Sequence, residues 1–259
     1  MPGAKRMRIL LTNDDGVSAA GLLALKNALQ DLGEMTVVAP AGEQSGTSLA
    51  LTYLGPIHTG PARLADGYPA QKVEGRPVDC VKFALLELLD EPPDLVVSGL
   101  NVGLNTGVNV LYSGTVAAAL EGSMGGVTSA AFSTVPADGG QIEWAAEQSR
   151  RVLDMLLDSH DGTARTYNVN IPEATDSPPV CVFTRQATQP FNERYRAAGQ
   201  GGDKNSYRLE TAPNPIKRVE DETDVGALLA GRISVTPLSA DLTDTECLRS
   251  ARGSESVLA

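Results

Sequence analysis

Residues 7–17 read MRILLTNDDGV, a continuous apolar run that ends abruptly in polar residues and a glycine. Continuous rather than alternating hydrophobicity indicates a strand at 7–12 that is covered on both faces, as in a parallel sheet. A helix is predicted next, over 20–30, because leucines recur on one face and a glycine follows as a left-handed stop. A second strand at 35–39 completes one β-α-β unit. The opening of the chain therefore predicts an α/β fold.

The same alternation of apolar strands and amphipathic helices continues through most of the chain. Further strands are predicted at 71–74, 94–98, 129–133, 166–171, 180–184 and 233–237, and further helices at 77–89, 115–124, 141–157 and 223–230. This order is typical of a Rossmann-like, doubly wound, mostly parallel sheet.

One long stretch breaks the alternation. Residues 185–215 are polar, contain glycines and offer few apolar side chains to bury. Such a segment is either an exposed arm or one that packs on another subunit. We therefore divide the chain into an α/β domain at 1–184, an extended arm at 185–215, and a return to the domain with a polar tail at 216–259. The end of that tail, 241–259, is expected to fray.

The charge and hydropathy of the chain exclude two classes of partner. Acidic residues outnumber basic ones by 32 to 21 among 259 residues, which gives a formal net charge of -11. Because this charge repels a phosphate backbone, we expect no nucleic-acid polymer as ligand. We expect no membrane either, because no apolar run approaches the ~20 residues that a span needs.

Histidine and cysteine are too few and too scattered for a nitrogen–sulfur metal site. The chain contains only His58, His160, Cys80, Cys181 and Cys247, without C-x-x-C or H-x-x-x-H spacing. A zinc site of that kind is therefore not expected. Scattered cysteines and the lack of a basic-then-apolar leader predict a reduced, cytoplasmic protein. Both histidines are predicted to be surface or loop residues.

Two adjacent carboxylates, Asp14 and Asp15, follow the first strand directly. Ligands of doubly wound sheets bind outside the carboxyl ends of the strands, so this position is a candidate site. Neighbouring carboxylates repel each other, and a cation would offset the repulsion. An Asx-turn combined with a helix N-cap explains the same residues without a ligand, and at this point both interpretations stay open.

The loop after the second strand, residues 39–48, reads APAGEQSGTS. Ser45 and Gly46 offer a hydroxyl ligand and a backbone that an anion can approach closely. A plain turn is the alternative, because most Ser-Gly pairs are turns.

The loop after the strand at 94–98 is long, and three asparagines alternate with glycines in it. It carries Asn101 and Asn105 and enters a helix at Ser113-Gly114-Thr115. Helix N-termini present free N–H groups and the positive end of the helix dipole, so this start is a candidate anion site. Capping of the helix by Ser113 or Thr115 is the alternative.

Together these loops supply oxygen donors only. Two carboxylates, a serine hydroxyl and an asparagine amide suit a hard divalent ion such as Mg²⁺ or Mn²⁺. A phosphate would then bridge the ion and the helix start at 113–115. This layout indicates metal-assisted hydrolysis of a small phosphate ester.

The motifs at these positions resemble the SurE family of metal-dependent 5'/3'-nucleotidases, also called survival protein E. The resemblance is carried by ILLTNDDGV (9–17), VVAPAGEQSGTS (37–48), VEGRPVDCVKFAL (73–85), VVSGLNVGLNTGVNVLYSGTVAAALEG (96–122) and TDVGALLAGRISVTPLSADLT (223–243). It implies one divalent ion per subunit, held by Asp14, Asp15, Ser45 and Asn101.

The resemblance also implies the remaining roles. The phosphate would lie against Gly46, Asn105, Ser113, Gly114 and Thr115, and Asp14, Asp15 and Asn105 would be catalytic. The Rossmann-like fold of the family carries an extended hairpin that exchanges between subunits. The resemblance therefore implies a homodimer or homotetramer formed through the 185–215 arm. The histidines that relatives often carry near 17–20 and 47–49 are absent here, which points to different surroundings for the substrate.

Three alternatives remain at the level of sequence. A related phosphatase could serve another small phosphorylated metabolite, such as a natural-product intermediate. A haloacid-dehalogenase-type phosphatase would need a nucleophilic aspartate where this chain has Asn13. A non-catalytic sensor would bind a phosphorylated ligand and release no phosphate.

Overall fold

The computed structural model describes residues 6–251 except 137, 160, 176, 190–192, 199–204 and 212–219. The strands of its main sheet are β1 (Met7–Thr12), β2 (Gly33–Pro40), β3 (His58–Arg63), β4 (Pro69–Glu74), β5 (Leu95–Val102), β6 (Ser129–Thr134), β7 (Thr166–Ile171), β8 (Cys181–Phe183) and β11 (Ile233–Leu238). The helices are α1 (Ala20–Leu29), α2 (Pro77–Phe83), α3 (Gly114–Met124), α4 (Gly139–Asp158), α5 (Asp224–Leu229) and α6 (Thr245–Ala251), with a π-helix η1 (Ala84–Leu88) and a 3-10 helix η2 (Gly107–Leu111).

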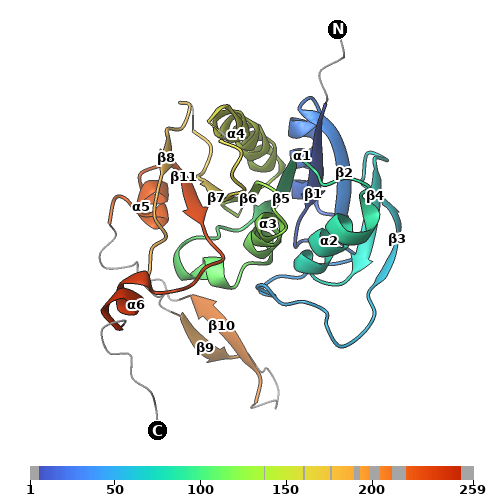
Figure 1. The fold of residues 1–259 in the computed structure, drawn as a ribbon. Coiled ribbons are helices and arrows are strands. Elements are labelled where there is room, and N and C mark those ends of the chain that lie inside the picture. The colour runs from blue at the N-terminus through green and yellow to red at the C-terminus, as the bar shows by residue number, and fades with distance from the viewer. Residues whose placement is uncertain are drawn as a thin grey trace.

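The main sheet is mostly parallel, and helices cover both of its faces (Figure 1). Its strand order is β3-β4-β2-β1-β5-β6-β7-β11-β8. The six strands from β4 to β7 in this order run parallel, whereas β3 and β11 run antiparallel to β4 and β7. The predicted doubly wound α/β fold is confirmed.

Strand β1 shows why its apolar run is continuous. Ile9 and Leu11 pack in the core beneath α1 and α4, whereas Leu10 packs in a second core beneath α2. Because successive side chains of a strand point to opposite faces, a strand with helices on both sides needs apolar residues at every position.

The chain changes direction across the sheet between β1 and β5. From β1 it proceeds to β2 on one side, and from β5 to β6 on the other. Thr12 at the end of β1 lies in register with Ser98 of β5, so the loops that follow these strands begin side by side. Doubly wound sheets bind ligands at such a switch point.

Three elements differ from the expectations. Strand β3 was not predicted: its sequence HTGPAR contains glycine and proline, which an exposed edge strand tolerates, and it carries the exposed His58. The helix predicted at 77–89 changes from α to π geometry at Ala84. The tail expected to fray forms α6 at Thr245–Ala251, with no buried residue. His160 and 252–259 lie outside the described residues.

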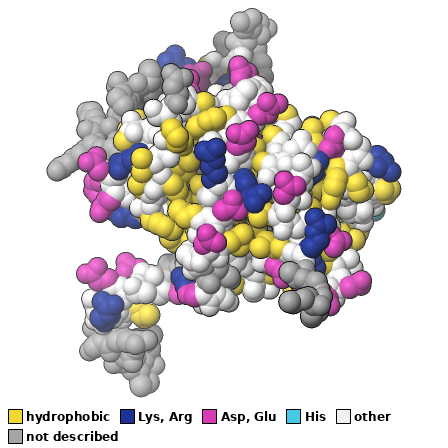
Figure 2. Space-filling model, turned by 90° about the horizontal axis from the view of Figure 1, so that it is seen from above, with side chains coloured by type: hydrophobic (Ala, Val, Ile, Leu, Met, Phe, Trp, Pro, Cys, Tyr) yellow, Lys and Arg dark blue, Asp and Glu magenta, His cyan; other side chains and the backbone are white. Residues whose placement is uncertain are grey.

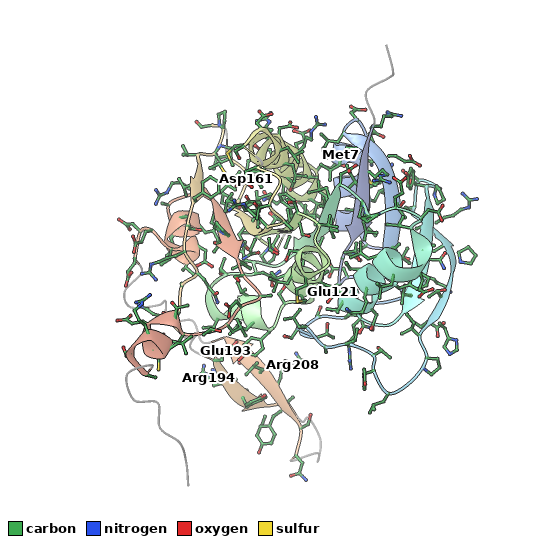
Figure 3. The ribbon with its side chains drawn as sticks, in the orientation of Figure 1. Met7, Glu121, Asp161, Glu193, Arg194 and Arg208 are labelled. Carbon is green, nitrogen blue, oxygen red and sulfur yellow. The ribbon has the colours of Figure 1, made fainter. Side chains whose placement is uncertain are left out.

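A hairpin of β9 (Glu193–Ala197) and β10 (Tyr207–Thr211) lies within the predicted 185–215 arm. Figure 1 shows it below the body, away from the main sheet. Figure 2 shows the molecule from above, with acidic and basic side chains interspersed over that face. In Figure 3 the labelled Glu193, Arg194 and Arg208 lie on this hairpin, away from the sheet. Across the pair Tyr195 faces Leu209, and both are exposed. A two-stranded hairpin with an apolar face is marginally stable alone.

Candidate active site at the switch point

The loop after β1 is closed by Asn13. Its buried side chain donates from Nδ2 to the Gly16 carbonyl at 3.0 Å and accepts from the Gly16 N–H at 3.2 Å. Gly16 has a φ of 98°, a conformation that glycine adopts without a steric cost. With both amide atoms engaged, Asn13 shapes the turn that carries Asp14 and Asp15. An amide in this position offers no carboxylate nucleophile, so the haloacid-dehalogenase alternative lacks its key group.

Asp14 is held against the start of α3. Its side chain is buried, and Thr115 donates to Asp14 Oδ1 from Oγ1 at 2.5 Å. The backbone N–H of Thr115 also donates to this carboxylate. A Cβ at Gly114 would lie 2.9 Å from the Asp14 Cβ, so only glycine permits the approach. The sequence indicates a candidate anion site at the start of α3. In the structure, the hydroxyl and the N–H of Thr115 at this helix start bind the carboxylate of Asp14.

Both carboxyl groups have raised pKa values. Burial is the largest cause for Asp14. For Asp15, burial, then the charge of Asp14, then that of Glu43 raise the pKa to about 6. The backbone N–H of Val102 donates to Asp15, and this hydrogen bond lowers the pKa of Asp15. A bound cation would reduce the repulsion between the two negatively charged carboxylates.

The loop after β2 lies against the aspartates, but its serine faces elsewhere. The Gln44 N–H donates to the Asp14 carbonyl at 2.7 Å. The exposed Ser45 donates to Glu43 Oε1 at 2.8 Å rather than meeting the aspartate pair. Gly46 is exposed with a φ of 72°, and no heavy atom would lie within 4 Å of a Cβ there. Glu43, which the sequence did not single out, is thus a third carboxylate at this edge.

Asn101 lies where β5 departs from regular pairing. The register between β5 and β6 shifts between Ser98 and Asn101, and such irregularities redirect side chains at strand ends. Asn101 is half-buried and donates from Nδ2 to the Gly103 carbonyl at 2.6 Å. This bond uses the amide nitrogen, and a cation would use the oxygen, Oδ1. Val102, the next residue, is the one that contacts Asp15.

Asn105 belongs to a separate cluster of buried polar side chains. Its N–H donates to Asn170 Oδ1 at 2.8 Å, and its Nδ2 donates to Ser133 Oγ at 2.8 Å. Its carbonyl accepts from Asn168 Nδ2 at 2.8 Å and from Asn170 Nδ2 at 3.1 Å. Sequence reasoning missed these three partners, although two asparagines in the apolar strand TYNVNI are a signal, because buried polar groups need partners.

The end of the same loop is tied to the C-terminal part of the chain. The fully buried Asp224 accepts from the Gly107 N–H at 2.8 Å through Oδ2 and from the Ala187 N–H at 2.9 Å through Oδ1. Gln186 donates to the Gly107 carbonyl at 2.8 Å. The base of the arm therefore holds the loop that carries Asn105, a connection that the sequence did not reveal.

Ser113 behaves as the capping alternative predicts. It is the N-cap of α3, and its Oγ accepts from the Val116 N–H at 3.2 Å. Its own N–H donates to the Asn109 carbonyl. Ser113 therefore fixes the helix start, which in turn holds Asp14 through Thr115.

The described carboxylates at this edge of the sheet are not arranged to coordinate a metal ion by themselves. Within the described ranges, no group of three or more His, Cys, Asp or Glu side chains is arranged to hold a metal ion. Hydroxyl and amide oxygens would have to complete the coordination, and Ser45 and Asn101 lie in the two loops beside the aspartates. Among the described helices, none combines the length and apolar character that a bilayer crossing requires.

Known proteins resemble this chain along most of its length. The family described as Survival protein SurE matches residues 9–193. The 5'-nucleotidase SurE of Rhodopirellula baltica is 44% identical over 245 residues, covering 93% of this chain and 96% of the relative. That of Desulforudis audaxviator is 43% identical over 247 residues, covering 93% and 95%. The crystal structure of SurE protein from Aquifex aeolicus superposes with a TM-score of 0.81 at 33% identity, covering 96% of this chain and 100% of that chain. The chain belongs to the SurE family.

Proposed function

We propose that this chain is a divalent-metal-dependent phosphomonoesterase that hydrolyses nucleoside 5'- or 3'-monophosphates to nucleoside and phosphate. Relatives at 36–44% identity named 5'-nucleotidase SurE support the activity. The observation that carries the proposal is the aspartate pair at the switch point. Asp14 is fixed to the start of α3, and burial and charge raise the pKa of Asp15 beside it to about 6.

Asp14, Asp15, Ser45 and Asn101 would hold one Mg²⁺ or Mn²⁺ ion. Their donors are all oxygens, which suits a hard cation. Burial first, and then neighbouring carboxylates, raise the pKa of both aspartates, and a bound cation would offset both effects. Ser45 would bind the ion through a lone pair of Oγ, because its hydroxyl hydrogen is donated to Glu43. When bound, such an ion supplies the positive charge that neutralises a phosphoryl oxygen and activates water.

The chain's own residues would position the substrate and move a proton. A carboxylate oxygen of Asp14 or Asp15 takes the proton of the attacking water. The phosphate lies against Gly46, Asn105 and the helix start at 113–115, where the N-terminal end of the dipole favours an anion. Asn105 is held in place by Ser133 and the two asparagines of β7, so little rearrangement is needed when charge develops.

Assembly and location are part of the same proposal. The apolar face of the hairpin, with Tyr195 and Leu209, supports a homodimer or homotetramer in which the 185–215 arm packs on a second copy. The free state of Cys80, Cys181 and Cys247 supports a cytoplasmic protein.

A phosphate-release assay tests the proposed chemistry. Nucleoside 5'- and 3'-monophosphates are incubated with Mg²⁺, with Mn²⁺ or with a chelator, using the wild type, Asp15→Asn and the control Asp31→Asn, which changes an exposed residue. We expect release only with metal, and a loss of at least about a hundredfold in Asp15→Asn. Weaker Mn²⁺ binding by Asp15→Asn, measured by calorimetry, should accompany the loss. Unchanged turnover in this variant would contradict the assignment.

A further inference from the structure

A cavity of about 240 Å³ lies beside the start of α3. Five parts of the chain enclose it: the loop after β2, the η2 segment with Ser113, helix α3, Gln186, and the end of β11 with the segment that follows. Most of its wall is aliphatic. We call it the leucine cup and define it by Leu49, Val110, Leu111, Leu120, Leu238 and Leu242.

The leucine cup adjoins the proposed phosphate site. Ser113, which caps α3, lines the cup, and the next residue, Gly114, is in contact with Asp14. Ser48 also lines the cup and belongs to the same loop as Ser45, and its N–H donates to the Tyr112 carbonyl at 3.0 Å. The cup and the proposed phosphate site therefore share the helix start at Ser113.

Each polar side chain that lines the cup has one hydrogen-bonding group engaged within the protein. Ser48 Oγ donates to the Leu111 carbonyl at 2.6 Å, and Gln186 Nε2 donates to the Gly107 carbonyl at 2.8 Å. Ser113 Oγ and Ser239 Oγ accept backbone N–H groups. The described lining residues include no charged and no aromatic side chain. A ligand in the cup is thus offered aliphatic surface and few hydrogen-bonding groups.

The rim of the cup is apolar surface that the described part of the chain leaves uncovered. Leu49, Leu111 and Leu242 are 43%, 53% and 80% exposed, whereas Val110 at the floor is buried. Single exposed leucines are common, but three around one cavity form a patch of the kind that marks a binding site. Pockets for small molecules combine such apolar walls with a few polar groups.

We propose that the leucine cup is the subsite for the organic group of the phosphate ester and holds that group by apolar contact. In a nucleoside monophosphate, the base lies with its faces against the leucines, and its hydrogen-bonding edges are not read. Esters with a compact apolar group are accepted as well as nucleotides, and esters with a small polar group gain nothing from the cup. This inference rests on the proposed phosphatase activity.

The test compares three phosphate esters under the activating metal: a purine nucleoside 5'-monophosphate, phenyl phosphate and glycerol 3-phosphate. The variants are Leu111→Ser and Leu242→Ser at the rim, with Leu229→Ser as a control. Leu229 is 73% exposed on α5 and does not line the cup. All have their molecular mass in solution measured, because a subunit could also cover the rim.

We expect each rim variant to raise KM for the nucleotide and for phenyl phosphate by about tenfold. The turnover number kcat, the KM for glycerol 3-phosphate and inhibition by inorganic phosphate should stay unchanged, as should every parameter of Leu229→Ser. Unchanged KM values in both rim variants overturn the inference, and so does an equal rise for glycerol 3-phosphate. A changed mass without changed selectivity also overturns it, because the rim is then a subunit contact. Absence of phosphate release from every ester by the wild type overturns the proposed function itself, and the inference with it.

Discussion

The switch-point site and the β9-β10 hairpin are two opposite ways of arranging polar residues. At the site, Asp14, Asn105 and Asp224 are buried, and their hydrogen bonds reach into distant parts of the chain. On the hairpin, all the residues of β9 are exposed, and Arg196 and Glu210 form an ion pair across the two strands. The side chains of the site are therefore held by contacts with distant parts of the chain, whereas the ion pair of the hairpin joins its own two strands.

Replacement of the buried Asp224 is expected to have the largest effect of the variants proposed here, because it removes an acceptor that connects distant parts of the chain. Asp224→Ala leaves the buried N–H groups of Gly107 and Ala187 without their acceptor, so we expect a loss of about 3 kcal/mol in the free energy of unfolding. Urea denaturation measures it. Asp244→Ala is the matched control, because Asp244 also accepts a backbone N–H, from Cys247, but at an exposed position. Equal losses in the two variants would show that burial does not set the strength of this anchor.

A methyl group at Gly114 should disturb the site most, and it would also lie 3.1 Å from Pro77 Cγ at the start of α2. The added Cβ would lie 2.9 Å from the Asp14 Cβ and 3.1 Å from its Oδ2, so the carboxylate must move. We expect Gly114→Ala to lower kcat/KM for phosphate release by about a hundredfold, equivalent to about 2.7 kcal/mol. Gly139→Ala is the control, since nothing lies within 4 Å of a Cβ there. A wild-type rate in Gly114→Ala would mean that the contact with Asp14 is dispensable.

The charge of the aspartate pair predicts how the metal-free protein responds to pH. The pKa of Asp15 rises from 3.8 in the unfolded chain to about 6 in the folded one, so the folded state binds more protons between these values. In chelator, stability should therefore fall as pH rises through this window. The full shift is worth about 3 kcal/mol, and solvent screening of the partly exposed carboxylate reduces this to about 2 kcal/mol. Asp15→Asn should flatten the profile of thermal unfolding against pH. An identical slope in wild type and variant would be inconsistent with the raised pKa.

The hairpin should give the smallest effect on the chemistry and a clear effect on assembly. Leu209→Ser removes an exposed apolar side chain opposite Tyr195. We expect light scattering to show a lower mass, while kcat stays within about twofold because surface changes of this kind cost little in the fold itself. Leu248→Ser on α6, also exposed, serves as the control. An unchanged mass in Leu209→Ser would separate the hairpin from assembly.

The sequence predicts the sheet and the first loop because their signals are local. Eleven residues, 7–17, are enough to predict a buried strand that ends in Asn-Asp-Asp-Gly. Asp14 therefore follows directly after the end of that strand. Strand β3 was missed since its glycine and proline suit only an exposed edge, which is a property of its position in the sheet.

The supports of the site could not be predicted in the same way. Ser133, Asn170 and Asp224 act on residues that are 28, 65 and 117 positions away in the chain. Each is an ordinary polar residue in its own segment, and only the fold makes it a partner. The direction of Ser45 is a further case, since a sequence cannot tell whether a hydroxyl turns toward Glu43 or toward the aspartates.

The hydrogen bond from Thr115 to Asp14 joins residues 101 positions apart, which has a consequence for biosynthesis. A growing chain cannot form this bond until Thr115 has left the ribosome. The hydrogen bonds that Asp224 accepts from Gly107 and Ala187 form later still. Contacts between residues so far apart in sequence form slowly, because a long loop must close first. The arrangement of side chains at the switch point is therefore complete only after the segment that carries Asp224 has been synthesised.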